Sequence, residues 1–148
     1  MKRITELVES AAALPRPAAA PAGSPESLAD ALTARMLAEP AIDRLVPKDK
    51  REMMQTNHVN HFRYMDSLAG IYSPDSFVQT VVWAMSAYRA HGFAIGYWDR
   101  MLRHCLDVLK ENSPAAHDGI AAQYRWILEH LGDLEPLTAP ESEKENAV

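Results

Sequence analysis

Two histidines, His58 and His61, lie three residues apart in the stretch NHVNHFRYM, which covers residues 57–65. An imidazole ring can ligate a metal ion or the iron of a haem, and it can hydrogen-bond a bound molecule. Residues three apart on a helix lie on the same face, so one ligand can reach both rings. These two residues are therefore the first candidates for a binding site.

The helix that must position them has an apolar stripe that includes both histidines. Its members follow one another at steps of four and three: Met54, His58, His61, Met65, Leu68 and Tyr72. Such spacing is typical of the buried face of a helix. A buried imidazole needs hydrogen-bond partners, and Asn57, Tyr88 and Tyr124 are candidates. Three interpretations remain: a polar layer that sets helix register, a pocket in which both histidines contact a ligand, metal or tetrapyrrole, or a different helix phase that leaves both in solvent.

A second candidate feature is the aromatic stretch YRAHGFAIGYW, residues 88–98. One interpretation is a plain helix end, with Gly92 in a left-handed conformation and Phe93 folded back onto the core. The other is a corner that closes one end of the bundle above the histidines, with Arg89 and His91 as polar gates or anion contacts. The predicted ligand-binding residues are then His58, His61, Tyr88, Arg89, His91 and Tyr97.

A cofactor could use the same histidines. Zinc sites need three or four protein ligands, and the further donors are His91, His104 with Cys105, and His117, without an HxxxH or CxxC motif. Haem needs a single proximal histidine. A haem or metal held by His58 or His61 is therefore the alternative to a pocket for another ligand.

The sequence contains no motif of a known reaction. A glycine-rich phosphate loop, a GxSxG elbow and an HExxH pair are all missing from it. Cys105 lies on an apolar stripe with Leu102 and Leu109, which predicts a buried, inert thiol rather than a nucleophile. We therefore predict that the protein is not an enzyme.

Regularly placed helix-start and helix-stop residues predict an all-α fold. Ser24-Pro25, Ser73-Pro74 and Ser113-Pro114 each place a capping hydroxyl before a proline, as at helix starts, and Gly92 and Gly132 stand where helices should stop. Helices are predicted near residues 25–38, 48–71, 74–91, 95–112 and 114–131, with a turn around 41–46. We expect a bundle of four to five helices, for which globin-like crossing angles are one arrangement.

Composition restricts the function further. The 148 residues carry a formal net charge of −5 and no basic stripe, which argues against nucleic acid, and no apolar run is long enough to span a membrane. The single cysteine favours the reducing cytoplasm as location.

We predict a helical domain over residues 25–134, preceded by an N-terminal segment with a Pro/Ala-rich linker (1–24) and followed by a disordered acidic tail (135–148). We predict a homodimer, because four large apolar residues lie off the main stripes, where they would form an interface: Val82, Trp83, Val108 and Trp126.

The order HFRYMDSLA, SPDSFVQTVVWAMSAYRAHGF and YWDRMLRHCLDVLKENSP resembles bacterial helical sensory modules over about residues 50–130. It is similar to helical domains found beside cobalamin-binding domains and to the globin-like, non-haem sensor domains of stressosome proteins. This resemblance implies a sensory or interaction module, often dimeric, with a protein signalling partner. The function we predict is a non-enzymatic helical sensor or interaction module with an internal pocket, in bacterial signalling; the alternative is a haem- or metal-binding carrier or sensor.

Overall fold

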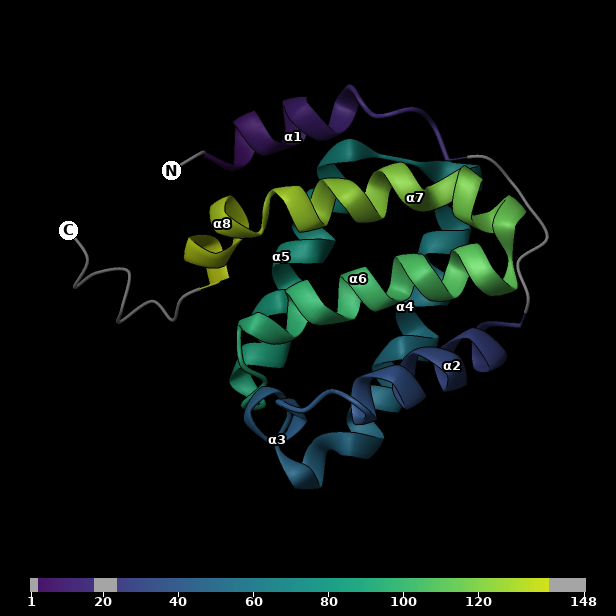
Figure 1. Cartoon of the computed structure of the whole chain (residues 1–148). Helices are drawn as coiled ribbons and strands as arrows, with labels where there is room; N and C mark the ends of the chain where they lie inside the picture. The colour runs from purple at the N-terminus through teal and green to yellow at the C-terminus, as the bar shows by residue number, and fades with distance from the viewer. Residues whose placement is uncertain (1–2, 18–23, 139–148) are drawn as a thin grey trace.

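The computed structural model describes residues 3–17 and 24–138, and these residues form only helices and their connections (Figure 1). The helices are α1 (Ile4–Ala12), α2 (Pro25–Leu37), α3 (Ile42–Leu45), α4 (Arg51–Ile71), α5 (Pro74–Ala90), α6 (Gly96–Asn112), α7 (Pro114–Glu129) and α8 (Leu131–Leu134), with 3-10 turns η1 (Lys48–Lys50) and η2 (Glu135–Thr138). The prediction of an all-α fold is confirmed, and the predicted helix boundaries differ from the observed ones by a few residues at most.

Two of the three Ser-Pro pairs act as predicted. The Ser24 hydroxyl accepts a hydrogen bond from the Ser27 backbone N–H at 3.0 Å, and Ser73 does the same for Ser76 at 3.4 Å. Ser113 precedes α7, but its side chain makes no capping bond. Proline at the first turn of α7 fixes its backbone for the helix without that bond.

The two glycines predicted as helix stops differ. Gly92 has φ +88°, and the Phe93 backbone N–H bonds the Tyr88 carbonyl at 3.0 Å, so α5 ends in the left-handed turn predicted, with Phe93 buried. Gly132 lies inside α8 and does not end a helix. Helix α7 ends just before His130, whose backbone N–H still donates to the carbonyls of Trp126 and Ile127.

Helix α2 packs against α4 and α6, α6 packs against α7, and α1 packs against α5 (Figure 1). Helices α4 and α5 follow each other in sequence, but they are not among the helix pairs whose backbones pack closely. The cavity described below lies partly between these two helices.

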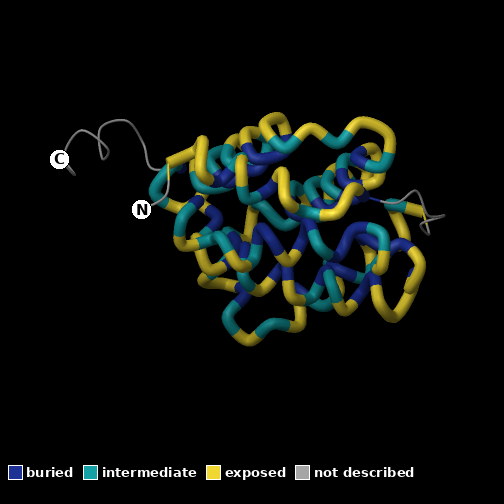
Figure 2. The backbone as a smooth tube through the Cα atoms, turned by 90° about the horizontal axis from the view of Figure 1, so that it is seen from above, coloured by how far each residue is buried: buried dark blue, intermediate teal, exposed yellow. Residues whose placement is uncertain are grey.

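The core lies at the centre of the bundle, and the exposed backbone faces outward (Figure 2). Of the stripe residues named above, Met65, Leu68, Leu102 and Cys105 are buried as expected; Trp98, Ile120 and Ile127 are buried as well, and Leu106 is half-buried. Val108 and Trp126, predicted to lie on an interface, are buried instead. Helix α6 has neighbours on two sides, and Trp126 is covered by α1, whose Ser10 hydroxyl accepts the indole N–H at 2.9 Å.

Helix α1 belongs to the packed core, outside the predicted domain limits of 25–134. Leu7 and Ala11 are fully buried, and the Tyr72 hydroxyl donates to the Ala11 carbonyl at 2.7 Å. At the other end, η2 packs against α5, and Thr138 is buried. The linker residues 18–23 and most of the predicted tail, residues 139–148, lie outside the described residues. Among the described residues, no helix combines the length and apolarity needed to cross a membrane.

Candidate functional site

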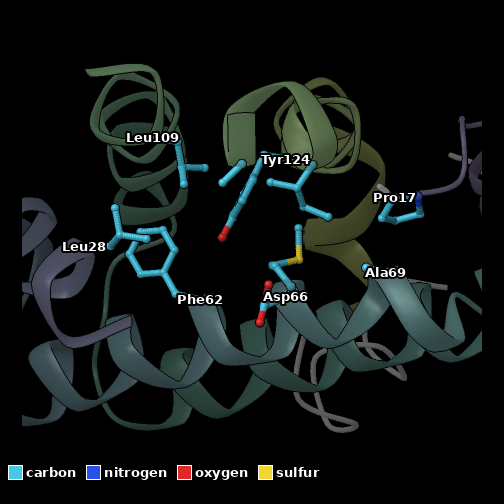
Figure 3. A pocket seen from close by; sticks show the side chains of 10 residues that line it. Pro17, Leu28, Phe62, Asp66, Ala69, Leu109 and Tyr124 are labelled. Carbon is cyan, nitrogen blue, oxygen red and sulfur yellow. The ribbon is translucent and has the colours of Figure 1, made fainter. Parts of the chain in front are cut away.

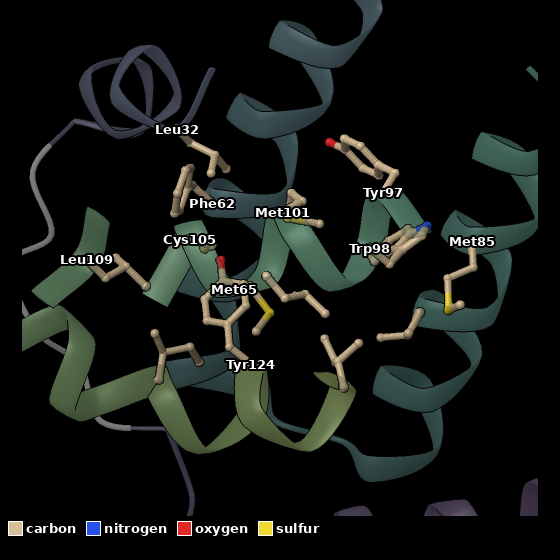
Figure 4. Packing of buried hydrophobic residues seen from close by; sticks show 14 of the residues in the cluster. Leu32, Phe62, Met65, Met85, Tyr97, Trp98, Met101, Cys105, Leu109 and Tyr124 are labelled. Atoms are coloured by element: carbon tan, nitrogen blue, oxygen red, sulfur yellow. The ribbon is translucent and has the colours of Figure 1, made fainter. Parts of the chain in front are cut away.

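A cavity of about 490 Å³ opens between α4, α5, α6 and α7. Most of its wall is apolar, and it includes Met53, Met65, Val81, Ala84, Ala87, Met101, Leu102 and Ile127. Figure 4 shows how Met65, Met101 and Trp98 lie between these helices. Among the described residues, the lining contains no lysine, arginine, aspartate or glutamate. A cavity of this size and polarity is typical of a small-molecule site.

His58 lies beside the cavity but does not line it. Its side chain is completely buried, and each ring nitrogen has a partner: Nδ1 lies 2.7 Å from the Thr33 hydroxyl and Nε2 lies 2.8 Å from the Tyr97 hydroxyl. These bonds connect α4 to α2 and α6. The first of the three sequence interpretations, a polar layer that sets register, therefore describes His58.

His61 lines the cavity. Its Nδ1 lies 3.1 Å from the Tyr124 hydroxyl. Its Nε2 is shielded from solvent and has no hydrogen-bond partner among the described residues. A buried polar atom without a partner costs about 1–3 kcal/mol, so this nitrogen is a site at which a ligand can gain affinity.

Both rings are neutral when the protein is folded. Burial lowers the pKa of His58 to about 2, and the neighbouring His61 lowers it further in the same direction. Burial alone lowers the pKa of His61 to about 3. An imidazole that stays neutral can donate from one nitrogen and accept, or ligate a metal, through the other.

The aromatic corner contributes part of the cavity wall. Tyr88 and His91 line it with Trp98, and the Tyr88 and Trp98 rings lie 4.9 Å apart. Tyr97 is fully buried beneath this corner and bonds His58, whereas Arg89 does not line the cavity. Of the six predicted ligand-binding residues, the structure therefore brings His61, Tyr88 and His91 to the cavity and leaves His58, Arg89 and Tyr97 outside it.

The wall also contains residues that the sequence reasoning did not select. Tyr64 of α4 and Thr80 of α5 both line the cavity, one on each of two facing helices. Trp83, one turn after Thr80, lines it as well while remaining 71% exposed. Their positions on facing helices follow from tertiary packing. The local signal that was available is the pair of small residues Ala84 and Ala87, which leaves room beside α5.

A second, much smaller cavity of about 30 Å³ lies on the other side of Tyr124, bounded by Phe62, Asp66 and Leu109 (Figure 3). This volume suits about one water molecule. Tyr124 and Met65 line both cavities, so the Tyr124 ring forms part of the partition between them. The small cavity is too narrow for a cofactor or an organic ligand.

The metal and nucleophile candidates are not assembled into a site. No group of three or more His, Cys, Asp or Glu side chains in the described residues could hold a metal ion. His104 Nε2 bonds Glu39 at 2.6 Å, away from the cavity. Cys105 is fully buried, and burial raises the pKa of its thiol, as expected for an inert core cysteine.

Comparisons with protein-family models, with curated proteins and with solved structures found no match for this chain. The function therefore has to be argued from the cavity and its residues.

Proposed function

We propose that this protein is a non-enzymatic helical sensor or interaction module that binds a small molecule in the cavity between α4 and α7. The observation that carries this proposal is His61, which belongs to the wall of an apolar cavity of about 490 Å³ and whose buried Nε2 has no hydrogen-bond partner among the described residues. Apolar pockets with a few placed polar groups are the usual form of a ligand site.

Two further features support a binding role. Three methionines, Met53, Met65 and Met101, lie in the wall, and flexible thioethers let a pocket adapt to its ligand. The resemblance of residues 50–130 to bacterial sensory modules points in the same direction and would give the bundle a globin-like arrangement. We place such a module in the cytoplasm, where a signalling partner would respond to the bound state.

Binding can be tested with 1-aminoanthracene, a neutral apolar dye that fluoresces when it leaves water. We expect saturable fluorescence with the wild-type protein. Ala84→Phe, which fills the cavity from α5, should weaken the signal at least tenfold. Ala90→Phe is the matched control, because Ala90 lies on the exposed side of the same helix and does not line the cavity. A lack of saturable binding by the folded wild type would contradict the proposal.

We also propose that the protein self-associates, although fewer of the predicted interface residues are exposed than the sequence indicated. Of the four residues predicted for the interface, Trp83 is the large exposed one, at 71%. We propose a two-fold dimer through the outer face of α5 around Trp83. Light scattering at high micromolar concentration should report a dimer for the wild type and a monomer for Trp83→Ser; a monomeric wild type would end this part of the proposal.

A haem carrier is the second candidate, because a buried neutral imidazole with a free Nε2 is what axial ligation requires. The cavity fits haem only in part: its wall includes His61, but the described residues that line it supply no lysine or arginine for the two propionates. Haemin titration tests this. A Soret shift that His61→Ala abolishes and His91→Ala keeps would support haem, and an unchanged spectrum would exclude it.

A further inference from the structure

We infer that the cavity takes an amphiphilic molecule, whose apolar end lies against α6 and α7 and whose polar end hydrogen-bonds Asn57, Asn60 and His61 on α4. This inference rests on the proposed function and specifies the kind of ligand and its orientation. It depends on how polarity and exposure are distributed over the wall, and on the grouping of these three side chains.

The α6 and α7 side of the wall, which we call the floor, is mainly apolar and closed to solvent. All the described lining residues of these two helices are buried: Trp98, Met101, Leu102, Tyr124 and Ile127. The Tyr124 hydroxyl already lies 3.1 Å from Nδ1 of His61, so it has a partner within the protein. The floor therefore suits apolar contact, and a polar group buried there without a hydrogen bond would be disfavoured.

The α4 and α5 side, which we call the mouth, is polar and open. Every asparagine and histidine among the described lining residues lies on α4 or at the end of α5: Asn57, Asn60, His61 and His91. The exposed members of the lining are on this side too, namely Asn60, Trp83 and His91. Polarity and exposure thus both increase from the floor to the mouth, so a ligand can keep its polar end near water while its apolar end is buried.

Asn57, Asn60 and His61 form one polar cluster at the mouth. Asn57 precedes Asn60 by three residues and His61 by four, so the three side chains are neighbours on one face of α4. Each amide can both donate and accept a hydrogen bond. The Nε2 of His61 is buried and has no hydrogen-bond partner among the described residues, so it gains from a polar group that a ligand brings.

Ligands that are polar throughout or apolar throughout fit this wall less well. An entirely apolar molecule would leave the buried Nε2 of His61 without a partner and would cover the amides of the cluster. A molecule with polar groups at both ends would place one of them on the floor, where it would lose its hydrogen bonds to water. An amphiphile avoids both costs.

The test uses three probes built on one ring system: naphthalene, without a polar end; 2-naphthamide, with one; and naphthalene-2,6-dicarboxamide, with two. Each probe competes with 1-aminoanthracene. 2-Naphthamide should bind about tenfold more tightly than naphthalene, as expected for one or two buried hydrogen bonds. The dicarboxamide should bind at least tenfold more weakly than 2-naphthamide, because its second amide reaches the floor.

Substitutions locate the polar end. In the double variant Asn57→Leu, Asn60→Leu, the ratio of amide affinity to hydrocarbon affinity should fall about fivefold. An unchanged affinity for naphthalene shows that the cavity of this variant is intact. Gln55→Leu is the matched control: it removes an amide from the same helix, but Gln55 donates to Asp30 at 2.6 Å and does not line the cavity. This control should keep the wild-type ratio.

The orientation can be measured directly by NMR. The methyl group of Met101, on the floor, should show nuclear Overhauser contacts to the ring protons of 2-naphthamide that lie farthest from its amide. Contacts only to the protons beside the amide would reverse the orientation and overturn the inference.

The outcomes separate the two proposals. If the dye binds but 2-naphthamide binds no more tightly than naphthalene, the amphiphilic ligand is overturned while ligand binding stands. Equal affinity for 2-naphthamide and the dicarboxamide would overturn it as well, and so would an equal loss of the amide preference in Gln55→Leu. If the dye does not bind, both proposals fail.

Discussion

The rings of His58 and His61 lie 5.8 Å apart in an edge-on arrangement, one turn apart on α4, yet only His58 has hydrogen bonds at both nitrogens. The two side chains share a helix face and a neutral state, but they contact different surroundings. His58 holds three helices together, and His61 presents one unused nitrogen at the cavity. Their substitution should therefore have different effects.

His58→Leu should lower the free energy of unfolding by about 2–4 kcal/mol, because it leaves the hydroxyls of Thr33 and Tyr97 without their partner. His61→Leu should cost less, about 1–2 kcal/mol, because it leaves one hydroxyl, that of Tyr124, without its partner and removes a nitrogen that already lacks a bond. Urea unfolding measures both. Equal losses at the two positions would show that the assignment of roles is wrong.

Stability should fall on acidification. Both histidines have folded-state pKa values far below the unfolded value of about 6.5. The unfolded chain therefore takes up protons that the folded state refuses, so the stabilisation is present above pH 6.5 and is lost as the pH falls below it. Between pH 7.5 and 5.5 the two sites together should cost about 2–3 kcal/mol. His61→Leu should remove about half of this loss, and a wild type with a flat profile over this range would contradict the buried neutral pair.

Two buried leucines offer a test of the cavity itself. Leu32 is fully buried away from the cavity, whereas Leu102 is buried and forms part of its wall. Leu32→Ala should cost about 3–5 kcal/mol and Leu102→Ala about 2–3 kcal/mol, because a side chain beside an existing void has fewer contacts to lose. Chemical denaturation measures both losses, and a larger loss at Leu102 would mean that the cavity closes in solution.

The side chains of Tyr64 and Thr80 should control access to the cavity, since they line it from α4 and α5, whose backbones do not pack closely. Tyr64→Phe should raise the dissociation rate of bound 1-aminoanthracene by about two- to tenfold, the range expected for the loss of one polar contact. Stopped-flow dilution measures this rate. Tyr72→Phe is the control, because its hydroxyl bonds Ala11 and does not line the cavity; an equal rate change in the control would contradict the gating role.

The helices could be predicted from the sequence because their signals are local. Ser24-Pro25 and Ser73-Pro74 start helices through contacts within three residues, and Gly92 ends one through its own backbone. The apolar stripe of α4 was also correct: Met54, His58, Met65 and Leu68 are buried, and Phe62 joins them. His61 lies at the edge of that stripe, and this position takes it to the cavity.

The division of roles between the histidines could not be predicted, because it depends on residues far along the chain. Thr33, the partner of His58, lies 25 residues earlier on α2, and Tyr97 lies 39 residues later on α6. Trp126 was expected on the surface because its cover, Ser10 of α1, is 116 residues away. The cavity is lined by residues of four helices, α4 to α7, so its position depends on tertiary packing.

The contacts of α1 also determine an order of events during folding. Its Ser10 contacts Trp126 and lies 3.4 Å from His130, and Gln123 donates to the Pro15 carbonyl just after this helix. Helix α1 can pack on α5 before α7 is synthesised, but its contacts with α7 close a long loop and form slowly. Until they form, the indole of Trp126 lacks its partner on α1. A chain in which α7 has formed and α1 has not yet docked on it is therefore the species most exposed to aggregation and to capture by chaperones.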